Sequence, residues 1–313
     1  MKSQRVQEEP ASPADAPTGE SGLGLVIGTH RTLALLILAS LVLQSLIFEP
    51  VCWWPIAFVC LVPWLLLVGG AGYAPRVYFY SYLLALAFFL INLRWLWPAT
   101  GLGYGALSAY LAVYFPLMAC ALRSAVRRRR WPLAVVFPFI WVGSEILRAV
   151  VISGFPWFFL SHSLHRVLTL IQVSDLVGAY GVSFVVAAVN GAVADLILAL
   201  LSNRREAGLA HGLRQVRGSL AWAGCLVIAS VVYSQVRLHQ DTLSTGPKIA
   251  VLQGDFLSLV SGDRESDEEK RRIYFAMMDK AAEHEPDLYL LPETPWIMYL
   301  NPEARDFHPF WRG

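Results

Sequence analysis

Charged side chains are scarce in this sequence of 313 residues, because Asp, Glu, Lys and Arg make up 15% of it while 56% is hydrophobic. Soluble domains carry roughly 25% charged residues. So much apolar sequence cannot all be buried in a soluble core of this size. The composition therefore excludes an ordinary soluble protein and predicts a membrane protein. The formal net charge of +2 says little by itself, since the position of the charges matters more.

Cysteine-based sites are missing as well. No cysteine belongs to a CxxC pair or to a Cys/His metal spacing, so neither a metal centre nor a disulfide framework follows. The stretch GLGLVIG lacks the preceding strand of a dinucleotide loop. We therefore expect no metal and no cofactor. Each cysteine lies in an apolar run and is predicted to be a small buried hydrophobe; these are Cys52, Cys60, Cys120 and Cys225.

Long apolar segments dominate residues 25–240. A membrane span needs roughly 20 apolar residues, and seven segments qualify: about 25–48, 51–70, 77–97, 102–122, 131–152, 176–201 and 219–236. They predict an α-helical polytopic membrane bundle of about seven spans. Residues 1–24 are polar and rich in Pro, Ser and Gly, so they are predicted to form a disordered cytoplasmic tail. Residues 153–175 are aromatic but broken by Pro156, which predicts an interfacial or re-entrant piece.

The cations are distributed unevenly between the loops. If the N-terminus is cytoplasmic, the inner loops 71–76, 123–130 and 202–218 hold ten arginines, whereas the outer loops hold only Arg166. With seven crossings, the positive-inside rule then places everything after about residue 240 on the outer side of the membrane. The run of four arginines at 127–130 is explained by topology, so we expect no nucleic-acid partner.

A separate extracytoplasmic domain is predicted from residue 241 to 313. KIAVLQGD is typical of a strand, Asp267 opens a helix that should reach about Glu283, and DLYLLPE is typical of the next strand. Such a strand–helix–strand unit usually opens an α/β domain. Glu293 follows the second strand between Pro292 and Pro295. It is predicted either to act as a general base or to be a solvated glutamate at a strand end.

Three further groups of polar residues are candidates for a functional site. Glu145 and Arg148 share a helix face in the fifth span, where a structural pair is favoured over a lipid head-group site. Arg94, beside two tryptophans, is either a head-group ligand or, as favoured, a snorkelling anchor. His162 and His165 flank Ser163, with Asp175 further on, which loosely suggests a hydrolytic triad; no nucleophile-elbow pattern surrounds the serine, so this interpretation is rejected.

Four stretches, in order along the chain, resemble the apolipoprotein N-acyltransferase family: INLRWLWPAT, SEILRAVVISGFPWFFLSHS, VLQGD and PDLYLLPETPW. The resemblance implies a nitrilase-like α/β sandwich outside the membrane, on a bundle with seven spans before it and one after. It also implies transfer of an acyl chain from a phospholipid, through a cysteine thioester, to the diacylglyceryl cysteine of an apolipoprotein. Its catalytic residues are a glutamate, a lysine and a cysteine, in that order.

Of this catalytic set, the resemblance carries over only the glutamate, as Glu293. No lysine or cysteine follows it in the sequence. We therefore expect residues 241–313 to be the truncated start of the nitrilase-like domain, and the chain alone to be inactive. Two alternatives stay open: half of a split enzyme, partnered by a separately encoded C-terminal half, and a non-catalytic membrane protein that binds lipid.

Overall fold

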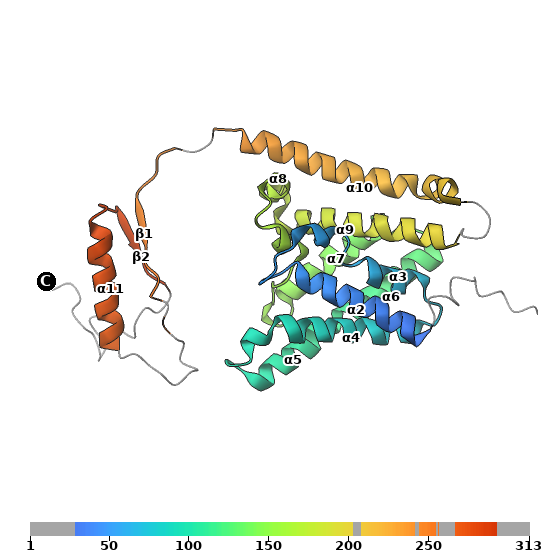
Figure 1. Cartoon of the computed structure of the whole chain (residues 1–313), viewed down its shortest axis with the longest axis horizontal. Coiled ribbons are helices and arrows are strands. Elements are labelled where there is room, and N and C mark those ends of the chain that lie inside the picture. The colour runs from blue at the N-terminus through green and yellow to red at the C-terminus, as the bar shows by residue number, and fades with distance from the viewer. Residues whose placement is uncertain (1–28, 203–207, 242–243, 255, 257–266, 293–313) are drawn as a thin grey trace, which may run out of the picture. The chain divides into compact units, whose positions relative to one another are not determined.

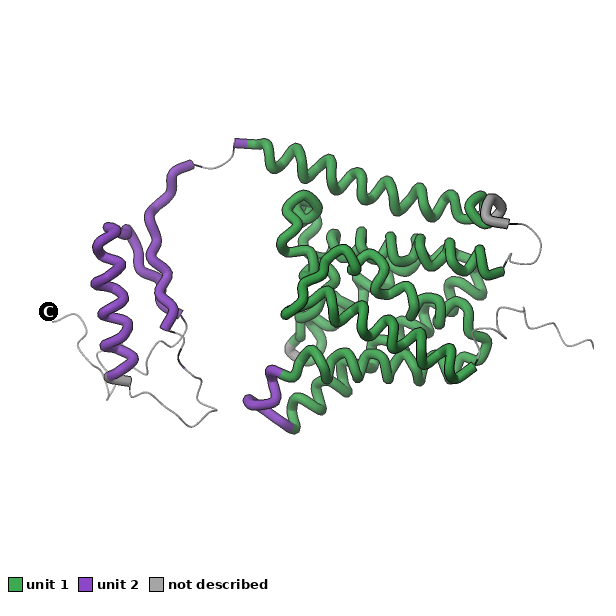
Figure 2. Tube along the Cα trace, in the orientation of Figure 1, with its two compact units in different colours: residues 1–94, 102–240 green, residues 95–101, 241–313 purple. Residues whose placement is uncertain are grey.

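The computed structural model describes residues 29–202, 208–241, 244–254, 256 and 267–292 (Figure 1). The predicted tail 1–24 and the candidate base Glu293 therefore lie outside the described residues. The chain divides into two compact units (Figure 2). The larger unit comprises Met1–Arg94 and Leu102–Gln240, and the smaller comprises Trp95–Gly101 and Asp241–Gly313.

The larger unit is helical throughout its described part. Its elements are α2 (His30–Leu46), η1 (Trp54–Phe58), α3 (Val62–Gly70), α4 (Ala74–Asn92), η2 (Arg94–Leu96), α5 (Gly101–Ala112), α6 (Tyr114–Arg129), α7 (Leu133–Val150), η3 (Val151–Ser153), η4 (Leu160–Leu164), α8 (Leu168–Ile171), α9 (Ser174–Ser202) and α10 (Gly208–Leu238). Gly101, the first residue of α5, and part of η2 belong to the smaller unit. Helices α7 and α9 form the most extensive packed pair, and α10 lies along α9 (Figure 1).

Five helices in the described ranges are long and apolar enough to cross a membrane: 74–92, 101–129, 133–150, 174–202 and 216–238. The first two predicted spans form shorter apolar helices, at 30–46 and 54–70. A helical bundle with five candidate membrane spans is thus confirmed, and the count of seven full spans stays a prediction. The region after α7 contains only the short helices η3, η4 and α8 before α9 begins, which agrees with the interfacial or re-entrant piece expected there.

Buried polar side chains hold the interrupted helices together. Asn190 on α9 accepts a hydrogen bond from the backbone N–H of Leu61 at 2.9 Å and donates to the carbonyl of Ala57 at 2.8 Å. These bonds satisfy backbone groups at the break between η1 and α3, which would otherwise be unpaired in an apolar environment. Asp195, also on α9, accepts from the N–H groups of Leu133 and Ala134 and so caps the start of α7.

Arg123 departs from its predicted place in a cytoplasmic loop. It lies inside α6, is 6% exposed, and donates hydrogen bonds to the carbonyls of Val68, Ala71 and Gly72 at 2.7–3.0 Å. The end of α3 leaves these carbonyls without helical partners. The arginine therefore closes a helix end, although the sequence counted it as a topology signal.

The smaller unit contains a β–α–β element in its described part. Strands β1 (Ile249–Val251) and β2 (Leu288–Leu290) pair in parallel, with Ala250 opposite Tyr289, and α11 (Asp267–Ala282) connects them in sequence. The predicted strand–helix–strand order is confirmed. A two-stranded sheet is much less than a nitrilase-like sandwich, so that fold stays a prediction.

Candidate functional site

Arg148 is a buried cation near the end of α7. Its side chain is 5% exposed, and its Nη1 donates to the carbonyl oxygen of Trp157 at 3.2 Å. The guanidinium also lies over the rings of Phe89 and Phe159, at 5.8 and 5.5 Å from their centroids. Aromatic faces attract cations, most strongly when both are desolvated. Arg148 thus joins α4 and α7 to the segment that follows α7.

Glu145 lies one helical turn before Arg148 and is fully buried. Its Oε1 accepts hydrogen bonds from the indole N–H of Trp141 at 2.8 Å and from the backbone N–H of Leu160 at 2.9 Å. Its Oε2 has no hydrogen-bond partner in the described structure, and neither has the Oγ of Ser161. The described contacts give Glu145 and Arg148 different partners, and both residues fasten the segment after α7 to the bundle.

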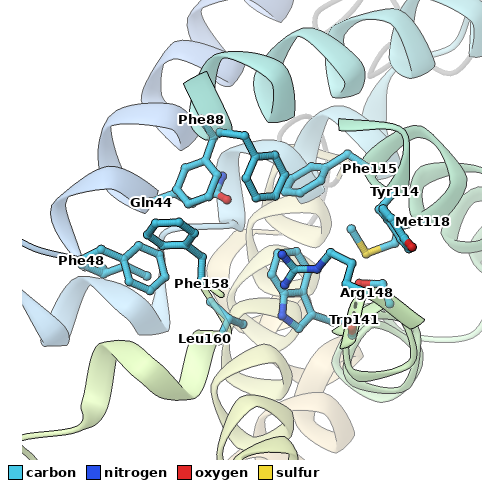
Figure 3. A pocket seen from close by; sticks show the side chains of 13 residues that line it. Gln44, Phe48, Phe88, Tyr114, Phe115, Met118, Trp141, Arg148, Phe158 and Leu160 are labelled. Atoms are coloured by element: carbon cyan, nitrogen blue, oxygen red, sulfur yellow. Dashed lines mark hydrogen bonds between the residues drawn. The ribbon is translucent and has the colours of Figure 1, made fainter. Parts of the chain in front are cut away.

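A cavity adjoins Arg148 and is walled mainly by aromatic rings (Figure 3). Its lining residues come from α2 and the two residues after it, from α4, α6 and α7, and from the segment after α7: Gln44, Ile47, Phe48, Phe88, Phe89, Tyr114, Phe115, Met118, Trp141, Ser144, Arg148, Phe158 and Leu160. In the view of Figure 3, Phe48 and Phe158 gather on one side, with Tyr114 and Met118 on the other. The cavity measures about 20 Å³, which is room for a single water molecule.

The small size of this cavity bears on the two interpretations of Arg148. A lipid head group is far larger than one water molecule, so it cannot enter the cavity in this conformation. The structure therefore favours the structural role for Glu145 and Arg148, as the sequence did. Their described hydrogen bonds hold the segment after α7 against the bundle.

Gly154 makes the sharp turn that brings this segment back over α7. Its φ is +82°, a conformation that L side chains rarely adopt, and a Cβ atom there would lie 2.1 Å from the carbonyl oxygen of Ala149. Immediately after the turn, the N–H of Phe155 donates to the carbonyl of Arg148 at 2.6 Å. The GFPW stretch, residues 154–157, is thus a tight reversal that needs glycine at its first position.

Three aromatic rings that the sequence did not single out contact one another, and one of them, Phe158, closely follows this turn. Phe48 and Phe158 are 5.1 Å apart between ring centroids, and both contact Phe88, at 6.0 and 5.7 Å. Edge-to-face geometry of this kind adds stability beyond the buried area. Only the fold shows this cluster, because its members are 40 to 110 positions apart and each looks like an ordinary apolar residue in the sequence.

The remaining candidates are not brought into one site. Ser163 donates to the carbonyl of Leu160, His165 contacts the carbonyl of His162, and Asp175 pairs with Arg237. These contacts give no support to a hydrolytic triad.

Arg94 is exposed between α4 and α5, where Trp95 and Trp97 are 53% and 64% exposed. This exposure suits the anchor role favoured for Arg94, which stays a prediction. Cys60 is buried as expected, but Cys120 and Cys225 are exposed on the bundle surface, so the prediction of burial was wrong for them. No cluster of three potential metal ligands occurs within the described ranges.

Fold and site together define a multi-pass α-helical membrane protein with a buried Glu–Arg anchor in its core. Comparison with known proteins narrows this class. Residues 40–192 match the apolipoprotein N-acyltransferase N-terminal domain. The chain is 32% identical over 265 residues to an apolipoprotein N-acyltransferase of Rhodopirellula baltica, covering 78% of this chain and 46% of that protein.

Two further relatives with the same name agree. The one from Geobacter metallireducens is 29% identical over 263 residues, covering 80% of this chain and 49% of that protein. The one from Bradyrhizobium diazoefficiens is 24% identical over 302 residues, covering 87% and 53%. These matches confirm the resemblance to the N-terminal part of apolipoprotein N-acyltransferase. The chain spans about half the length of the curated relatives it matches.

Proposed function

We propose that this chain is the membrane bundle and the first catalytic portion of an apolipoprotein N-acyltransferase. The observation that carries the proposal is the match to relatives of that name over about four fifths of the chain. The reaction class is acyl transfer, the donor is a membrane phospholipid and the acceptor is the diacylated N-terminal cysteine of an apolipoprotein.

The proposed chemistry follows the family resemblance. A cysteine thiolate attacks the ester carbonyl of the phospholipid, the alkoxide of the lysophospholipid leaves with a proton, and a thioester forms. The α-amine of the acceptor then attacks the thioester, which forms an amide and returns the thiol. Glu293 is the proposed general base, and a lysine stabilises the oxyanion. No residue of this chain matches the lysine or the cysteine of this set.

The proposed role of the membrane bundle in this reaction is to position the catalytic groups. Acyl transfer between lipids requires the catalytic groups to be held at the membrane surface. Glu145 and Arg148 clamp the segment after α7 against the bundle through Leu160 and Trp157. We place the bundle in the bacterial cytoplasmic membrane, with residues after about 240 on its outer side, where apolipoproteins are exposed. The distribution of arginines supports this orientation.

A chimaera tests the proposed function. The chain would be continued with the C-terminal part of the Rhodopirellula baltica relative and incubated with phospholipid and a diacylated lipopeptide. Mass spectrometry should detect the triacylated product, and the 313-residue chain alone should give none. A chimaera that inserts and folds but forms neither thioester nor product would contradict the proposal. Product from the chain alone would instead show that its own residues suffice.

A further inference from the structure

A second and larger hollow lies on another side of the bundle. It is a groove of about 550 Å³ between α7, the first part of α9 and the last part of α10, and it shares no lining residue with the cavity at Arg148. This volume lies within the roughly 300–1,000 Å³ range of small-molecule sites. Gly178 lies beside the groove and interrupts α9, with φ +65° and ψ −171°.

The walls of the groove are mainly apolar. Its polar side chains are Tyr180, Ser230 and Tyr233. Ser230 donates to the carbonyl of Leu226 in its own helix, and the hydroxyl of Tyr233 donates to Asp175 at 2.7 Å. The other lining residues are apolar or glycine. An alkyl chain therefore suits the groove, whereas a polar metabolite does not.

Opposite charges lie at one end of the groove. Arg237 follows Tyr233 by one turn on the same face of α10, and its Nε donates to Oδ2 of Asp175 at 2.7 Å. The two side chains are 37% and 35% exposed, so a ligand can reach both. The described contacts of Arg237 use only its Nε and Nη1, and a guanidinium has five N–H donors.

Specific binding in the groove must be compared with non-selective filling by the lipids of the surrounding bilayer. Lipid tails are as apolar as the groove, so any acyl chain could fill it without preference. Selectivity must then come from the charged end. Arg237 suits a phosphate group, and Asp175 can accept hydrogen bonds from a primary ammonium group. This pair matches a zwitterionic phospholipid head group, and it stands where the apolar part of α10 ends at Leu238.

We propose that the groove between α9 and α10 binds one zwitterionic phospholipid, with an acyl chain beside Ala229 and its phosphate on Arg237. This lipid would be bound in addition to any substrate of acyl transfer. The inference does not depend on the proposed enzyme activity, because every residue it uses lies in the described bundle.

Native mass spectrometry of the purified 313-residue chain tests the proposal. Phosphatidylethanolamine should bind one to one and about tenfold more tightly than diacylglycerol, which lacks the whole head group, because charge-assisted hydrogen bonds are lost. Phosphatidylglycerol, which lacks the ammonium group, should fall between them. Equal binding of all three lipids would overturn the proposal, since it would mean non-selective filling by acyl chains.

Two substitutions with matched controls locate the site. Arg237→Gln should weaken phosphatidylethanolamine binding about tenfold, whereas Arg166→Gln, which removes a guanidinium that lines neither hollow, should not. Ala229→Phe should fill the groove and weaken binding, whereas Val232→Phe on the exposed face of α10 should not. Equal affinities within both pairs would overturn the proposal. A stable dimer of the chain that Ala229→Phe disrupts would also overturn it, because a second copy would then occupy the groove.

Discussion

Glu145 Oε1 lies 2.9 Å from the backbone nitrogen of Leu160, although fifteen positions separate these residues along the chain. The same oxygen also accepts the indole N–H of Trp141. One carboxylate oxygen thus fixes both a turn of α7 and the segment that folds back over it.

Glu145→Ala should destabilise the bundle by about 2–4 kcal/mol, because two buried N–H donors lose their acceptor. Glu145→Gln should cost less than Glu145→Ala, since its carbonyl oxygen still accepts from the two N–H donors, but it removes the negative charge that faces the buried Arg148. The control is Glu49→Ala, which removes an exposed ion pair with Arg166 worth at most about 1 kcal/mol. Unfolding in mixed micelles with increasing dodecyl sulfate measures all three. A loss for Glu145→Ala no larger than for Glu49→Ala would contradict this role.

Gly191→Ala should destabilise the contact between α7 and α9 by about 1–3 kcal/mol. A Cβ atom at Gly191 would lie 2.6 Å from the carbonyl oxygen of Leu133 and 2.7 Å from backbone atoms of Ala134, neither of which can move cheaply. Gly224→Ala is the matched control, because no atom lies within 4 Å of its added Cβ. It should be neutral or stabilising by up to about 1 kcal/mol. The same unfolding assay compares them, and equal effects would refute the close-packing argument.

The bundle should lose stability on acidification through His162. Burial of part of its ring, and then the positive charges of Arg148 and His165, lower the pKa of His162. Because the folded-state pKa is below the unfolded value of about 6.5, the unfolded chain takes up this proton first as the pH falls. The His162 contribution is therefore complete above about pH 6.5, and it is lost as the pH falls towards the folded-state value.

His162→Gln should flatten this pH dependence, whereas His165→Gln should leave most of it in place. Thermal unfolding in detergent between about pH 8 and pH 5 measures the slope around the ordinary histidine pKa. An unchanged slope in His162→Gln would assign the acid sensitivity to other groups.

Glu293→Gln should slow acyl-enzyme formation about 10²–10⁴-fold in the chimaera described above, if Glu293 is the general base. The amide keeps the shape of the side chain but cannot accept the proton. A solvated strand-end glutamate would instead give near-normal turnover. Trapping of the thioester with labelled phospholipid, at matched protein levels, separates these outcomes, and Glu269→Gln on the exposed face of α11 serves as the control.

A reporter fused after residue 245 should behave as exported. The ten-to-one distribution of arginines between inner and outer loops predicts this orientation. Alkaline phosphatase activity at that fusion would agree with an odd number of crossings before it. Cytoplasmic behaviour would contradict the count of seven spans.

The sequence predicted the positions of the helices and strands better than the breaks within the helices. Hydropathy located each apolar segment, and the acidic start at Asp267 correctly marked α11, because both signals are local. The break between η1 and α3 was missed because it depends on Asn190, which lies more than 120 positions away and supplies the missing hydrogen bonds. Helix α6 continues to Arg129 rather than ending near residue 122, because arginine is a good helix former and its charge suits a helix C-terminus.

In the candidate site, too, local features were predicted and long-range contacts were not. The spacing of Glu145 and Arg148 correctly placed them on one helix face. Nothing local indicated that their partners would be Leu160 and Trp157, because the turn at Gly154 creates those contacts. The groove between α9 and α10 was missed for a related reason: it depends on how two distant helices pack.

Helix α3 is much shorter than the hydrocarbon layer of a bilayer is thick. Its nine residues span about 14 Å, less than half of the roughly 30 Å hydrocarbon layer. A helix this short would force adjoining lipids to thin if it faced them. Instead α3 packs against α2, α4, α6 and α9, and most of its side chains are buried. Hydrophobic mismatch at α3 is therefore screened by its neighbours, and the thickness of the membrane places no direct constraint on its length.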